Sequence, residues 1–260
     1  MSWWRTLLRW RGNTTCRAPA IPDELWAWTL ALYPFISVRS EADLSRLRDL
    51  SAQFLATKEF HGAHGLVVTD QMAVAIAAQA CLPVLRLGLG PYRGFVGIVV
   101  HSDEVVARRS VTDEDGVVHE YDEWLTGEAM EGGPVMLSWP DVAMAGETAA
   151  GAYNVVVHEF AHVLDMGDGE PNGMPPLSDK AARARWAQCL GDSYAAFCEA
   201  LDCGDHTFLD PYGAQAPEEF FAVATEAFFV QPRSLRAEHP DLYSLLAGYF
   251  QQDPALTVRE

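Results

Sequence analysis

The stretch HEFAHVLD, residues 158–165, follows the apolar run AAGAYNVVV and predicts a buried helix that carries metal chemistry. His158 and His162 lie four residues apart, so on a helix both imidazoles project from one face and can share a cation. Glu159 stands beside the first histidine, where a zinc hydrolase has the glutamate that takes a proton from the water activated by the metal. HExxH also recurs by chance. A helix whose histidines form a buried polar cluster is therefore the alternative, and a third ligand would argue against it.

Two places can supply a third ligand. A metzincin continues as HExxHxxGxxH, but this chain has Asp165 and Asp168 at the glycine and final histidine positions. The carboxylate of Asp168 can ligate zinc, but without the glycine the helix has no obvious place to turn it inward.

The other source of a third ligand is a separate helix, as in gluzincins. PEEFFAVATE, residues 217–226, begins with proline, a typical first-turn residue. Glu219 and Glu226 are seven residues apart and share nearly one face, whereas Glu218 points elsewhere. Acidic side chains on an apolar helix are costly to bury unless they are paired or bind metal, so this helix offers a ligand and a supporting carboxylate. Solvated glutamates in the first turn and on an exposed face are the alternative.

The rest of the chain predicts an α+β fold, a small mixed sheet with the key helices C-terminal to it. Strands are expected within residues 94–101, 105–106 and 133–139. Helices are expected over residues 41–57, 70–80, 147–166, 178–201, 217–231 and around 242–250. The 260 residues are 49% hydrophobic and show neither an internal repeat nor a low-complexity linker. We therefore expect one domain over residues 21–260, preceded by a basic aromatic tail over residues 1–20.

Charge limits the classes of partner. Lys and Arg total 18 against 36 acidic residues, a net charge of −18, which argues against direct nucleic-acid binding and favours a basic partner surface. Ten of the acids fall within residues 102–132, which predicts a solvated hairpin and loop; a rim that selects substrates is the alternative.

The N-terminal residues and the cysteines bear on location. Arginines interleave with tryptophans and leucines over residues 3–11, which predicts a flexible or core-covering N-terminus, with an anionic membrane surface as the alternative. The arginines interrupt any secretory signal, and no stretch is long and apolar enough for a membrane span. Five cysteines without CxxC spacing favour a reducing compartment, so we expect a cytoplasmic protein.

HEFAHVLD, LDPYGAQAPEEFFAVATEAFF, CLPVLRLGL and GPVMLSW together resemble the Mlc titration factor A (MtfA) family of bacterial zinc-dependent peptidases. The resemblance covers roughly residues 21–250. It implies that His158, His162 and Glu219 bind one Zn²⁺ per chain and that Glu159 is the general base. The family is similar to the anthrax lethal factor catalytic domain, which implies that Tyr212 helps to stabilise the oxyanion. A core aromatic in a turn is the alternative for Tyr212.

Two further carboxylates are candidates for orienting the ligands. Asp165 lies three residues after His162 and can hold an imidazole N–H, and Glu226 can do similar work. Either can instead cap a helix or pair with an arginine.

Three functional hypotheses follow. The first is a zinc metallopeptidase that hydrolyses peptide substrates, with an aminopeptidase-like activity implied by the resemblance. The second, also implied by the resemblance, is a non-catalytic regulator that sequesters a Mlc-type transcriptional repressor and thereby influences the glucose phosphotransferase system. The third is a degenerate peptidase that keeps its metal for structure. The strand within residues 133–139 is expected to hold an extended substrate by strand addition.

Overall fold

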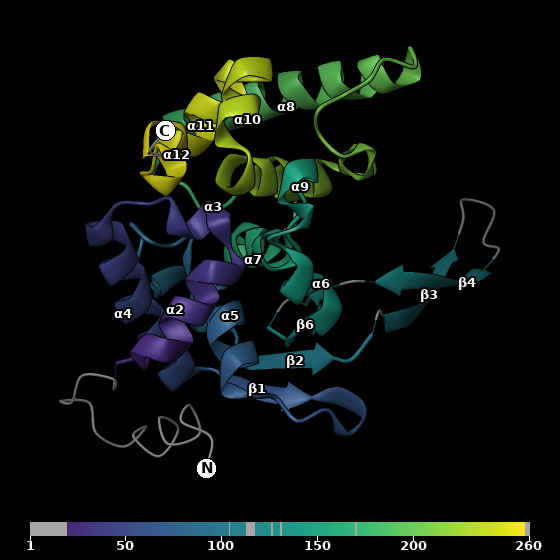
Figure 1. Ribbon diagram of the computed structural model, residues 1–260. Coiled ribbons are helices and arrows are strands. Elements are labelled where there is room, and N and C mark those ends of the chain that lie inside the picture. Colours follow the sequence, from purple (N-terminus) through teal and green to yellow (C-terminus); the bar gives the residue numbers. More distant parts are fainter. Residues whose placement is uncertain are drawn as a thin grey trace.

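A four-stranded sheet lies below the central helices in the computed structural model (Figure 1), which describes residues 20–103, 105–112, 118–125, 127–130, 132–169 and 171–257. The strand order is β1-β2-β6-β5, in which β1, β2 and β6 run parallel and β5 is antiparallel to β6. A separate antiparallel hairpin projects from the body. The strands are β1 (Glu59–Gly62), β2 (Gly97–His101), β3 (Val105–Thr112), β4 (Val118–Leu125), β5 (Gly127–Ala129) and β6 (Val135–Ser138).

The N-terminal helices lie beside the sheet, and the C-terminal helices form a layer on the other side of α7 (Figure 1). The N-terminal set is α2 (Asp23–Leu32), α3 (Pro34–Ser37), α4 (Glu41–Thr57) and α5 (Asp70–Cys81). The later set is α6 (Trp139–Met144), α7 (Val155–Asp165), α8 (Lys180–Asp202), α9 (Pro217–Val230), α10 (Pro232–Glu238), α11 (Pro240–Phe250) and α12 (Pro254–Thr257). This mixture of helices with a small sheet confirms the predicted α+β fold.

Side-chain caps mark the starts of α4 and α5. The Ser40 hydroxyl accepts a hydrogen bond from the Asp43 amide at 3.2 Å, and the Thr69 hydroxyl accepts one from the Met72 amide at 3.2 Å. Such caps satisfy amides that a helix leaves without partners in its first turn. Every residue of α5 from Met72 to Cys81 is buried, so this helix belongs to the interior and not to the surface.

The helix predicted over residues 147–166 begins later than expected. Residues 148–151 form a short 3₁₀ turn, and Ala152 adopts φ +61°, a left-handed conformation that an α-helix cannot contain. Asn154 then caps α7, because its side-chain oxygen accepts from the Val157 amide at 2.9 Å. The prediction of a helix from Glu147 was therefore wrong, and the buried asparagine marks the true start.

Helix α7 lies at the centre, in contact with α5, α9, β5 and β6 (Figure 1). Its Phe160 is fully buried among the rings of Phe54, Tyr92 and Phe95, at centroid distances of 5.7, 5.0 and 5.7 Å. Aromatic pairs in this range add to the burial of apolar area. The packing fixes the rotation of α7 about its axis, and thereby which of its residues face α9 and which face β5.

The sheet differs from the sequence prediction in two ways. β1 was not predicted, because the four residues EFHG have no apolar alternation. The strand at residues 135–138 was expected to bind substrate along an edge, but β2 and β5 flank it on both sides. Within the described part of the sheet, β5 is the edge strand next to the helix that carries HExxH.

The division into a tail over residues 1–20 and a domain over residues 21–260 remains a prediction, since residues 1–19 lie outside the described part. Across the ranges that the structure describes, no helix is both long and apolar enough to cross a membrane.

Candidate metal centre

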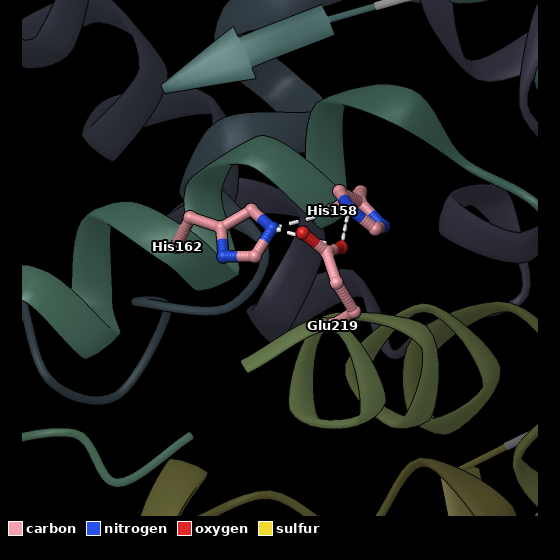
Figure 2. Close-up of side chains that lie close together, drawn as sticks. All are labelled: His158, His162 and Glu219. Carbon is pink, nitrogen blue, oxygen red and sulfur yellow. Dashed lines mark hydrogen bonds and ion pairs between the residues drawn. The ribbon is translucent and has the colours of Figure 1, made fainter. Parts of the chain in front are cut away.

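Three side chains from two helices converge on one point (Figure 2). The Nε2 atoms of His158 and His162, both on α7, lie 3.2 Å apart. The Oε2 atom of Glu219, from the first turn of α9, lies 3.1 Å from the first nitrogen and 3.3 Å from the second. These three residues are the group of potential metal ligands found among the described residues. The structure therefore brings together the three residues predicted as ligands.

The spacing of the three atoms fits a zinc ion. Tetrahedral zinc holds nitrogen and oxygen ligands at about 2.0–2.1 Å, which requires ligand atoms about 3.3 Å from one another. Two imidazoles and a carboxylate also form a catalytic type of zinc site, in which a fourth position is left for water or substrate. The side chains of His158, His162 and Glu219 are 12, 13 and 20% exposed, so the site is mostly buried and still reachable.

Glu226 contacts the His158 ring at its second nitrogen. Its Oε1 atom lies 2.8 Å from His158 Nδ1, on the side of the ring opposite the convergence point. A carboxylate there places the ring proton on Nδ1 and leaves the Nε2 lone pair for a metal. The other oxygen, Oε2, accepts a hydrogen bond from the backbone amide of Asn154.

Asn154 extends this network to a third helix. Its side-chain nitrogen donates to Gln79 Oε1 at 2.8 Å, and Gln79 on α5 donates in turn to the Ala75 carbonyl at 3.2 Å. Both residues are fully buried. Sequence reasoning missed them; the signal was a lone polar residue inside each of two apolar runs, MAVAIAAQAC and AYNVVV.

The Glu159 carboxylate lies against Gly127 of β5. Its side chain is 5% exposed, and a Cβ atom built on Gly127 would lie 2.5 Å from Glu159 Oε1 and 2.8 Å from its carboxyl carbon. A position without a side chain is thus required for the backbone of β5 to lie against this carboxylate. Sequence reasoning missed Gly127 as well, because nothing local marks it.

Burial and neighbouring charges shift the pKa values of Glu159 and Glu219 in opposite directions. Burial raises the pKa of Glu159 to about 7, opposed by the two histidines and reinforced by Glu219 and Glu226. Burial also acts to raise the pKa of Glu219, but hydrogen bonds from His158 and His162 prevail and lower it to about 2. A carboxyl poised near neutral pH beside an ionised one is typical of catalytic sites. The set of carboxylates around two imidazoles favours binding of a cation.

Tyr212 lies beside the ligands. Its ring centroid is 5.9 Å from that of His158, and the residue is 38% exposed, so it flanks the site from the solvent side. It belongs to a short 3₁₀ turn, residues 211–214, in which the Asp210 carboxylate accepts from the Tyr212 amide at 2.9 Å. The turn packs against α9, so the segment that carries Tyr212 is held next to the helix that carries Glu219.

Asp165 hydrogen-bonds to the loop after α7 and to neither imidazole of the ligand group. Its Oδ2 accepts from the Gly173 amide at 2.8 Å, while its Oδ1 is buried without a partner among the described residues. Burial raises its pKa to about 6, against the lowering effect of the Gly173 amide. Asp168, the alternative third ligand, is not a member of the ligand group in the described part of the chain. Of the two carboxylates predicted to orient the ligands, only Glu226 is in hydrogen-bond contact with one.

Comparisons with known proteins agree with this geometry. The family model described as glucose-regulated metallo-peptidase M90 matches residues 7–251. An uncharacterized protein of Synechocystis sp. is 35% identical over 253 residues, which cover 96% of this chain and 90% of that protein. Mlc titration factor A of Pectobacterium atrosepticum is 32% identical over 259 residues, covering 97% and 95%. Mlc titration factor A of Yersinia pestis is 30% identical over 241 residues, covering 91% and 88%.

Proposed function

The chain belongs to the glucose-regulated metallo-peptidase M90 family, and from that premise we propose that it is a zinc-dependent peptidase. His158, His162 and Glu219 would hold one zinc ion. The observation that carries the proposal is the mutual spacing of their donor atoms, 3.1–3.3 Å, which matches the edge of a tetrahedral zinc site.

The metal and the chain divide the chemistry. When bound, zinc supplies a Lewis acid that lowers the pKa of a water molecule and polarises the scissile carbonyl. Glu159 accepts the proton from the attacking water and passes it to the leaving amine. Its burial, which raises its pKa to about 7, makes both transfers possible near neutral pH.

Tyr212 and β5 bind and orient the substrate in this proposal. The phenol of Tyr212 donates a hydrogen bond to the oxygen on which negative charge develops. An extended peptide adds to the free edge of β5, so that its backbone lies beside Glu159, against which Gly127 packs.

Metal analysis and a single substitution test this function. Purified protein should contain one zinc ion per chain, His162→Ala should lose it, and His61→Ala, a control at an exposed histidine, should keep it. Glu159→Gln should keep zinc and lose hydrolysis of model peptides. Glu159→Gln that hydrolyses peptides at the wild-type rate would rule out the general-base role, and wild-type protein without zinc would rule out the metal site.

A second function is favoured by the names of two relatives, each called Mlc titration factor A. In this alternative the chain binds a Mlc-type transcriptional repressor through its acidic surface, which fits the net charge of −18 and a basic DNA-binding partner. Mixing the protein with a candidate repressor separates the two functions. Binding to the repressor should survive Glu159→Gln, whereas hydrolysis should not.

A further inference from the structure

A cavity of about 530 Å³ opens between the C-terminal end of α7, the chain after β5 and the turn at residues 90–94. Its described walls are apolar or glycine and carry no charged side chain. They include Phe95, Met130, Val163, Met166, Pro176 and Tyr249. The volume lies within the range of protein pockets that bind small ligands or side chains.

Two elements connect this cavity to Glu159. On α7, Val163 follows Glu159 by four residues, so it shares the face of Glu159 at a rise of about 6 Å, and Met166, directly after the helix, follows by seven residues, or about 10 Å. Met130, directly after β5, follows Gly127 by three residues, which is again about 10 Å of extended chain. The cavity therefore begins one helical turn from the proposed general base, on the side of α7 that faces β5.

The proposed substrate path along β5 leads toward this cavity, because the chain directly after β5 forms part of the cavity wall at Met130 and Gly132. A peptide on the edge of β5 advances about 3.3 Å per residue, so the 6–10 Å offset equals up to three residues from the bond that is cut. We propose, on the basis of the proposed function, that the cavity binds a large apolar side chain of the peptide within three residues of that bond. The protein then selects peptides with phenylalanine, leucine or a similar residue at this position.

Binding measurements test the inference without relying on hydrolysis. The probes are fluorescent peptides of alanine and serine with one central phenylalanine, alanine, aspartate or lysine, mixed with zinc-loaded Glu159→Gln protein. Burial of a phenylalanine side chain gives an expected affinity about 10- to 100-fold higher than that of the alanine peptide. Fluorescence anisotropy gives the dissociation constants.

Two substitutions that fill the cavity make the test specific. Val163→Phe and Gly94→Leu should each remove the preference for phenylalanine; an alanine side chain at Gly94 would meet no atom within 4 Å, so a larger residue there has room. Gly191→Leu is the matched control, because Gly191 on α8 is equally open and does not line the cavity. Zinc content confirms that each variant keeps its metal site.

The outcomes separate this inference from the proposed function. Preference for phenylalanine that both cavity variants abolish supports the inference, even if the wild-type protein hydrolyses no peptide. Equal affinity for all four peptides, a preference for lysine or aspartate, or a preference that survives in both variants would overturn it. Absence of peptide hydrolysis by the wild-type protein would contradict the proposed function and leave this inference unaffected.

Discussion

Replacement of Gly127 by alanine should displace the proposed general base without touching a metal ligand. The new Cβ would lie 2.5 Å from Glu159 Oε1, whereas ordinary contact begins at 3.4 Å, so the carboxyl group has to retreat by about 0.9 Å. Misplacement of a catalytic group by about 1 Å can reduce a rate by about 100-fold. We therefore expect kcat for Gly127→Ala to fall about 100-fold, with zinc content and KM near those of the wild-type protein.

The assay is steady-state hydrolysis of a model peptide over a range of pH, combined with metal analysis. Gly97→Ala is the matched control: it is also a glycine in the sheet, but its Cβ would lie 3.4 Å from Pro134 Cβ and far from the carboxylate. Because a displaced carboxyl group changes its solvation, the acidic limb of the pH profile should move in Gly127→Ala and stay in Gly97→Ala. Wild-type kcat in Gly127→Ala, or loss of zinc from it, would refute the reasoning.

Three further results are expected. Glu226→Gln should weaken zinc affinity by about 10- to 100-fold in a chelator competition, because the carboxylate that orients His158 loses its charge. Removal of metal with a chelator should lower Tm in a thermal scan, since the proposed zinc ion would bind the folded chain through groups that only folding brings together. Asp165→Asn should flatten the pH dependence of stability. Folding raises the pKa of Asp165 from 3.8 to about 6, so the folded chain holds this proton more tightly than the unfolded chain. The free energy of unfolding should therefore fall as pH rises through that window, by up to about 3 kcal/mol, in wild-type protein compared with Asp165→Asn.

Each of these results has a control. Glu218→Gln, on the same helix and outside the ligand group, should keep wild-type zinc affinity; equal losses in both variants would contradict the role of Glu226. The shift in Tm on chelation should vanish in Glu219→Ala, and a shift of the same size there would show that the metal binds elsewhere. Parallel stability curves for wild-type protein and Asp165→Asn would show that Asp165 is ionised in the folded state.

The convergence at the metal centre could be predicted from the sequence because it depends on helical spacing. The four-residue interval between His158 and His162 and the seven-residue interval between Glu219 and Glu226 fix which side chains share a face. Two acidic residues in an otherwise apolar helix also indicate that these acids are buried with a partner or a metal. Local periodicity therefore sufficed to find the two histidines and the helix that offers carboxylates, whereas the choice of Glu219 as the third ligand came from the family resemblance.

Features that depend on distant partners could not be predicted in this way. Whether a strand is an edge depends on its neighbours, and the pairing of β6 with β2 and β5 joins segments that lie apart in the sequence. The contact between Gly127 and Glu159 spans two elements with no shared pattern. Asp165 has the right spacing for an imidazole, but the Gly173 amide takes its carboxylate instead. Spacing identifies candidates, and tertiary packing selects among them.

The backbone amide of Asn154 connects the first turn of α7 to the candidate metal centre through Glu226. Glu226 bridges that amide and the ring of His158, while the side chain of the same asparagine caps the helix. Opening of the first turn would release the carboxylate that holds His158, so local opening and cation affinity are linked in both directions. An occupied site must slow hydrogen exchange at the Asn154 and Val157 amides, and a mutation that frays this turn must weaken the site from a distance. The stability of this helix end would then contribute to the affinity of the candidate site for a metal.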